Sequence, residues 1–105
     1  MKTDKIMTYL GLAAAKRSVV TGSDLVLKEV RKGKSSMCVL LASDASERTT
    51  KQITYKCTYY GVSLIRLDTD MEALGARIGK ISQVACVAVT DRGLSAQIIK
   101  NSTEG

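Results

Sequence analysis

Segments of helical periodicity alternate with short apolar segments along the whole chain, and this alternation constrains the fold most strongly. Apolar runs of strand length occupy residues 18–21, 36–42, 62–67 and 84–90. A segment with helical spacing of apolar residues follows each run, and another precedes the first. Strands that alternate with helices form a mostly parallel or mixed sheet with helices on both faces. The sequence therefore predicts an α/β fold, a three-layer α/β/α sandwich around a four-stranded mixed sheet.

The helices are expected over residues 4–16, 23–33, 44–61 and 69–78, with a last helix that carries Leu94, Ile98 and Ile99. Two of them begin with the spacing of a capping box, in which Asp44 precedes Glu47 and Thr69 precedes Glu72. Ser23 and Asp24 open the second helix, and glycines follow the ends of the helices. The uninterrupted apolar strand at residues 84–90 is expected at the centre of the sheet, covered on both faces.

The 105 residues suffice for one compact domain, and the chain has no proline, repeat or linker that would divide it. We therefore expect a single domain over residues 1–105. No apolar run reaches 18 residues, and charged residues interrupt the start of the chain where a signal peptide would be apolar. These features predict a cytoplasmic protein that makes no membrane contact.

The chain contains no histidine, which excludes the Ser–His–Asp triad, the Cys–His pair and His-rich zinc sites. Cys38, Cys57 and Cys86 include no C-x-x-C pair, and their apolar or helical surroundings predict buried structural thiols. The acids and lysines form no recognisable acid–base pair. We expect a protein that is not an enzyme, needs no cofactor and takes no small-molecule substrate; an enzyme built on acids, lysines or cysteines is the least favoured alternative.

Two motifs partly resemble known ligand-binding loops but lack residues that those loops require. Asp68, Asp70 and Glu72 alternate like the start of a calcium loop, but Ala73 occupies the position that requires glycine. Residues 75–82 approach a phosphate-binding P-loop, but they are one residue short, follow a helix and carry isoleucine at the Ser/Thr position. Helix capping accounts for the acids, and no metal site is expected.

The net charge of +6 is concentrated in one part of the sequence. Residues 16–34 contain two acids, Asp24 and Glu29, and six bases: Lys16, Arg17, Lys28, Arg31, Lys32 and Lys34. A run of charge is commonly just the solvated face of a helix. Here it surrounds the turn at residues 22–24, where the first amides of a helix are expected to be free for an anion or a base edge. We therefore favour a nucleic-acid contact, while Ser23 and Asp24 acting only as helix caps remains an open alternative.

Base stacking is not expected to be the main device of such a contact. The chain has no Phe or Trp, and its aromatic residues are Tyr9, Tyr55, Tyr59 and Tyr60. The last three lie in one predicted helix, whereas RNA-binding sheets and OB-fold barrels stack bases on aromatic residues of their strands.

Several motifs resemble one family in order and at compatible spacing. Residues 22–28, GSDLVLK, resemble the G-T-N-E-x-x-K turn of the kink-turn RNA-binding superfamily of ribosomal protein L7Ae. Residues 39–47, VLLASDASE, are similar to its strand that ends in an acidic turn at Asp44. The Leu-Gly pair at 74–75, Gly79 and VACVAV at 84–89 resemble its loop and final strand. The similarity extends over residues 4–100 and is greatest to the bacterial YlxQ-like branch.

The resemblance implies an α/β/α sandwich that clamps a sharply bent RNA. By position, the turn that reads sheared G·A pairs is Gly22, Ser23, Asp24, Leu25 and Lys28, and the loop that covers a flipped-out base is Gly79, Lys80, Ile81, Ser82 and Gln83. Lysines and arginines of the basic run would add affinity through phosphates. The sequence departs from the family at Asp24, where the family has Asn, and at Leu25, where it commonly has Glu.

The function that follows is recognition of a kinked, structured RNA, either ribosomal RNA or another stable RNA, with the ribosome as a candidate partner. The alternative is a protein-interaction module that docks a translation-related acidic partner on the same basic face.

Overall fold

A computed structural model describes residues 1–34 and 36–103 of the chain. The domain predicted over residues 1–105 also includes residues 35, 104 and 105, which lie outside this description. Within the described residues, four strands form one sheet in the order β1-β4-β2-β3: β1 (Val19–Thr21), β2 (Cys38–Leu41), β3 (Ser63–Arg66) and β4 (Cys86–Val89). β2 is parallel to β3, and β4 is antiparallel to both of its neighbours. The predicted mixed sheet of four strands is confirmed.

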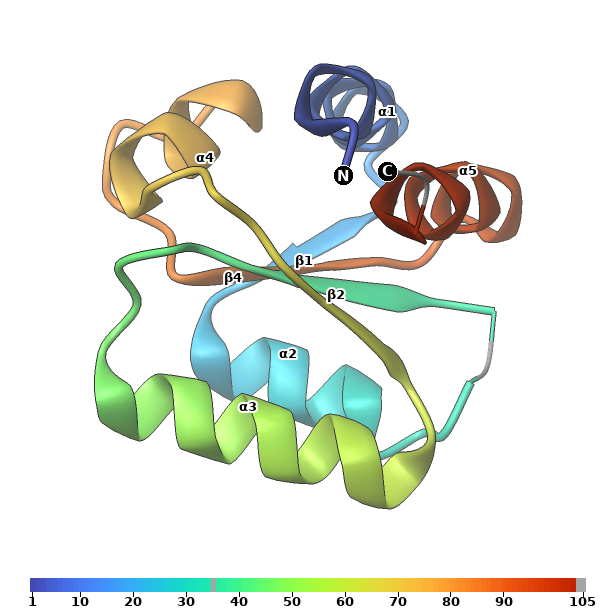
Figure 1. Ribbon diagram of the computed structural model, residues 1–105, viewed down its shortest axis with the longest axis vertical. Helices are drawn as coiled ribbons and strands as arrows, with labels where there is room; N and C mark the ends of the chain where they lie inside the picture. Colours follow the sequence, from blue (N-terminus) through green and yellow to red (C-terminus); the bar gives the residue numbers. More distant parts are fainter. Residues whose placement is uncertain (35, 104–105) are drawn as a thin grey trace.

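In the part of the chain that the structure describes, five helices cover the two faces of this sheet (Figure 1). α2 (Ser23–Val30) and α3 (Glu47–Tyr60) lie on one face, and α1 (Thr3–Ala15), α4 (Met71–Arg77) and α5 (Arg92–Thr103) lie on the other. The predicted three-layer α/β/α sandwich is therefore confirmed. Within the described residues, no helix combines the length and the apolar character needed to cross a membrane.

The two inner strands carry the core, because every residue of β2 and β4 is buried. Successive side chains of a strand point to opposite faces. Leu40 and Val87 accordingly pack with α1, α4 and α5, whereas Val39 and Ala88 pack with α2 and α3. The expectation that residues 84–90 form a central strand covered on both faces is confirmed.

The register of the strands gathers four connections at one end of the sheet. Thr21 lies opposite Val87, and Leu41 lies opposite both Cys86 and, on its other side, Arg66. The connections that follow β1, β2 and β3 and the one that precedes β4 therefore share this end, which lies at the left of Figure 1. We call this end of the sheet the turn end. The opposite end, where the connection from α1 to β1 and the connection from β4 to α5 lie, is called the far end.

Two predicted helix caps are wrong. α3 begins at Glu47, and its N-cap is Ser46, whose Oγ accepts a hydrogen bond of 3.1 Å from the amide of Thr49. Asp44 does not cap α3, because its carboxylate accepts from the amide of Met71 instead. α4 is capped by Asp70, not Thr69. The second helix also ends earlier than predicted, at Val30.

The three cysteines are free and buried, as predicted. Burial raises the pKa of Cys38 and of Cys57 to about 11. The thiols are therefore neutral at physiological pH and act as small apolar side chains of the core.

Candidate nucleic-acid interface

The turn between β1 and α2 depends on Gly22. Its backbone has φ 93° and ψ 141°, a conformation that favours glycine. Its carbonyl accepts the first hydrogen bond of α2, 2.9 Å from the amide of Val26. Apart from its two chain neighbours, no described residue has an atom within 4 Å of a Cβ added at Gly22, so the space in front of this backbone is open. A ligand can therefore approach the main chain closely at this turn.

The N-terminus of α2 presents unpaired donors at the same place. The amides of Ser23, Asp24 and Leu25 donate no hydrogen bond within the part of the chain that the structure describes. The N-cap is Gly22, so no side chain caps the helix, and the interpretation of Ser23 and Asp24 as helix caps is wrong. Free amides and the helix dipole give this end a partial positive charge that suits an anion or an acceptor on a base.

The side chains that follow Gly22 take different roles. Ser23 forms a hydrogen bond with the Cys86 thiol; burial raises the pKa of that thiol, and this bond opposes the rise. Asp24 and Leu25 are exposed. Asp24 forms no side-chain hydrogen bond or ion pair among the described residues, so its carboxylate is available to a ligand.

The loop between α4 and β4 lies across a groove from this turn. Thr21, Gly22 and Ser23 form one wall, and Lys80, Ser82, Gln83, Val84 and Ala85 form the other. Ile81, at the tip of the loop, is fully exposed. The structure thus brings together two segments that the sequence analysis placed in one site, although 57 positions separate Ser23 from Lys80.

Gly75 positions this loop and was not among the predicted site residues. Its carbonyl accepts a hydrogen bond of 2.9 Å from the amide of Lys80, and the carbonyl of Met71 accepts one of 3.1 Å from the amide of Val84. A Cβ on Gly75 would overlap the carbonyl oxygen of Ser82. Only glycine lets the loop lie this close to α4, and the Leu-Gly pair was the one signal in the sequence.

Asp44 lies at the turn end, but its carboxylate is engaged. Its Oδ1 accepts a hydrogen bond of 2.8 Å from the amide of Met71, the first residue of α4, while Asp70 accepts one from Ala73. The carboxylate therefore stabilises the N-terminus of α4. Its position in the acidic turn after β2 agrees with the prediction, whereas its partner could not be inferred from the sequence.

The basic residues in and after α2 lie at different distances from the groove. Lys28 is exposed, one turn from the groove, and it forms no ion pair among the described residues. Arg31 follows the end of the helix, roughly 12 Å along the axis from Ser23 at 1.5 Å per residue. Lys32 donates to Glu29 at 2.8 Å. Lys28 is thus the cation of α2 nearest to the groove.

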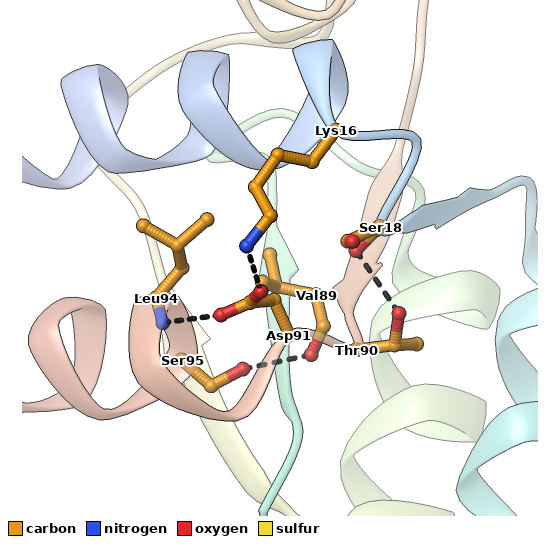
Figure 2. A network of polar contacts seen from close by, with 7 residues as sticks. All are labelled: Lys16, Ser18, Val89, Thr90, Asp91, Leu94 and Ser95. Atoms are coloured by element: carbon orange, nitrogen blue, oxygen red, sulfur yellow. Dashed lines mark hydrogen bonds and ion pairs between the residues drawn. The ribbon is translucent and has the colours of Figure 1, made fainter.

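Lys16 and Arg17 do not join the groove. Lys16 contacts the carboxylate of Asp91 at the far end (Figure 2). Arg17 has a positive φ of 59° in the turn before β1, outside the first helix. The prediction that the basic run surrounds the Gly22 turn is wrong for these two residues, because β1 crosses the sheet between them and Gly22.

Comparison with known proteins places these features in a family. Residues 4–99 match the sequence model of the ribosomal protein L7Ae/L30e/S12e/Gadd45 family. The chain is 46% identical over 90 residues to the RNA-binding protein YlxQ of Bacillus subtilis (strain 168), with 86% of this chain and 87% of the relative covered. It is 34% identical over 101 residues to the RNA-binding protein YlxQ of Enterococcus faecium, with 96% and 93% covered.

Solved structures share the fold. A Bacillus halodurans protein, described as one of unknown function, matches with a TM-score of 0.86 and 33% sequence identity. The match covers 95% of this chain and 98% of the Bacillus halodurans chain. The Giardia lamblia 15.5kD RNA binding protein matches with a TM-score of 0.81 and 19% sequence identity. The match covers 93% of this chain and 84% of the Giardia chain, and this likeness shows the fold alone. The predicted resemblance is confirmed: the chain belongs to the ribosomal protein L7Ae/L30e/S12e/Gadd45 family and is similar to its YlxQ-like members.

Proposed function

We propose that this protein binds a kinked, internally looped RNA in the groove between the Gly22 turn and the loop of residues 80–83. The observation that carries the proposal is the set of free amides at the start of α2, beside a groove whose other wall is a loop with a fully exposed tip, Ile81. The two YlxQ relatives are named RNA-binding proteins, and the chain covers nearly their whole length, which supports RNA as the ligand.

The two walls of the groove suit two parts of one RNA. On the α2 side, free amides and the Asp24 carboxylate offer donors and an acceptor to the edges of sheared G·A pairs, and the carboxylate suits the N–H groups of guanine. On the loop side, Ile81 offers an apolar surface on which an extruded base packs. Leu25 contributes apolar area only, since it cannot form a hydrogen bond.

Lys28 and Lys80 supply the charge of this site. Lys28 is exposed on α2, and Lys80 lines the groove. Each is assigned to a phosphate, so the affinity falls with rising salt concentration. Arg31 and Lys32 follow the other end of α2, so they would contact only phosphates of a duplex that extends beyond the groove. The ligand is ribosomal RNA or another stable RNA, met in the cytoplasm, and the ribosome is a candidate partner.

The experiment is a salt titration of binding to a kinked hairpin by the parent, Lys28→Ala and Lys80→Ala. Each variant is expected to weaken binding and to lower the slope of log affinity against log salt by about one. Lys100→Ala, on the α5 surface of the other layer, is the matched control and should bind as the parent does. A Lys28→Ala protein that binds as tightly as the parent, with the same slope, contradicts the assignment of the site.

A further inference from the structure

Two tyrosines of α3 are exposed and belong to neither core cluster of the described residues. Tyr55 is 65% exposed and Tyr59 is 69% exposed. Their ring centroids lie 6.4 Å apart with an angle of 22° between the ring planes. The ring of Tyr60 meets Tyr59 edge to face at 4.8 Å, which helps to fix the Tyr59 ring. Nearly parallel, accessible aromatic faces on adjacent helical turns are a surface on which bases can stack.

Cations accompany these rings. Arg48 lies seven positions before Tyr55, and this spacing puts the two residues on one face of α3. The Nζ atom of Lys56 is 5.8 Å from the centroid of the Tyr55 ring. Lys51 lies on the neighbouring strip of the helix, where it pairs with Glu47 at 3.0 Å. This face therefore has more positive than negative charge, which suits a polyanion.

A groove of about 700 Å³ lies beside the tyrosines. Its lining includes Ser43 after β2, Thr54 and Tyr55 of α3 and Arg66 at the end of β3. The Oγ1 atom of Thr54 is buried and has no hydrogen-bond partner among the described residues, an uncommon state for a polar group. Ser43 places the start of this groove at the turn end, the same end of the sheet as the Gly22 groove.

We propose that this surface, named here the α3 platform and comprising Arg48, Lys51, Tyr55, Tyr59 and Arg66, is a second RNA contact that takes a single-stranded segment. Bases stack on the tyrosines while Arg66, Arg48 and Lys51 meet phosphates. An acidic peptide would use the cations but would not need two accessible ring faces. The inference extends the proposed function, since a strand that leaves the Gly22 groove at the turn end can continue along α3.

The first test measures the fluorescence anisotropy of a labelled oligoadenylate of eight nucleotides with the full chain at low salt. Replacing both tyrosines (Y55A/Y59A) is expected to weaken binding by about tenfold or more, from the loss of stacking. The control Y55F/Y59F keeps the rings and should bind as the parent does. Both positions are exposed, so folding is not at risk, and circular dichroism verifies it. Equal binding by the alanine variant overturns the proposal, as does displacement of the RNA by polyglutamate at matched charge.

A second test separates this inference from the proposed function. A blunt kinked hairpin should bind the parent and Y55A/Y59A equally, and a single-stranded extension of the hairpin should tighten binding to the parent only. If the parent does not bind the blunt hairpin but binds oligoadenylate through its tyrosines, the proposed function is contradicted and the α3 platform is supported. If the extension tightens binding equally for both proteins, the α3 platform fails while the proposed function stands.

Discussion

The ammonium group of Lys16 contacts the carboxylate of Asp91, although the two residues are 75 positions apart (Figure 2). The other carboxylate oxygen of Asp91 accepts a hydrogen bond of 2.8 Å from the amide of Leu94 at the start of α5. One side chain thus caps α5 and holds the end of α1 beside it. This contact places Lys16 at the far end, in the α1 and α5 layer and away from the Gly22 groove.

The first prediction concerns acid stability. The hydrogen bond with Lys16, and then that with Leu94, lower the pKa of Asp91 below its ordinary value of 3.8. A lowered pKa in the folded state means that the contribution of this group to stability is complete above 3.8 and is lost as pH falls through the lower folded value. Asp91→Asn keeps an oxygen for the Leu94 amide but removes the charge. Urea unfolding between pH 5 and pH 2 should therefore show a smaller acid-induced loss in Asp91→Asn than in the parent, and an equal loss would contradict this account.

The second prediction concerns Gly75. Because an added Cβ would overlap the Ser82 carbonyl, Gly75→Ala must displace the loop of residues 80–83. The expected cost is about 1–3 kcal/mol of stability, together with weaker binding of a kinked hairpin. Gly93→Ala is the matched control, because its Cβ would be 3.5 Å from the nearest atom, an ordinary contact. Chemical denaturation and hairpin titration measure both effects. Unchanged hairpin affinity in a folded Gly75→Ala protein would show that the loop position is irrelevant to binding.

The third prediction separates the structural roles of Ser46 and Asp44. Ser46 caps α3, so Ser46→Ala should lower the free energy of unfolding by about 1 kcal/mol. Asp44→Ala instead removes the acceptor for the Met71 amide and should expose the start of α4 to faster amide hydrogen exchange. Exchange of the α3 amides should be unaffected in Asp44→Ala. Faster exchange at the start of α3 in that variant would restore Asp44 as the cap of α3.

The fourth prediction concerns the thiols. Burial raises the pKa of Cys38 and Cys57 to about 11, so neither is a thiolate at pH 8. The native protein should therefore react slowly with a thiol-specific disulfide reagent, and unfolding in urea should release three rapid equivalents, one for each cysteine. Rapid labelling of a native cysteine would mean that this thiol is accessible.

The fold was predictable because one physical signal dominates each element. β4 is apolar throughout, which predicted an inner strand, and the helices carry apolar residues at helical spacing. β2 is equally apolar, and the structure places it inside the sheet as well. The helix starts were less predictable, since Asp44 and Ser46 are both good N-cap residues. A tertiary contact with the amide of Met71, 27 positions away, decides between them.

The candidate site was predictable in its two segments but not in its charge. The helix start and the nearby charge pointed to the Gly22 turn, whereas the loop with Ile81 followed only from the family resemblance. The structure places the two segments on two walls of one groove. The basic residues were grouped by closeness in sequence, but β1 and α2 each span the sheet and separate Arg17 and Arg31 from the turn end. Base stacking was not expected of the α3 tyrosines because they lie in a helix and not on a strand. A helical position does not reveal exposure, and Tyr55 and Tyr59 are exposed in the structure.

The most direct test of the central claim is a mobility-shift titration of the parent protein with a kink-turn hairpin and with a straight duplex of equal length and charge. Shape-selective binding in the Gly22 groove predicts an affinity for the kinked hairpin at least about tenfold higher than for the duplex at the same salt concentration. Equal, weak binding to the two RNAs would contradict recognition of a kinked RNA and leave only non-specific attraction of a basic protein for phosphates.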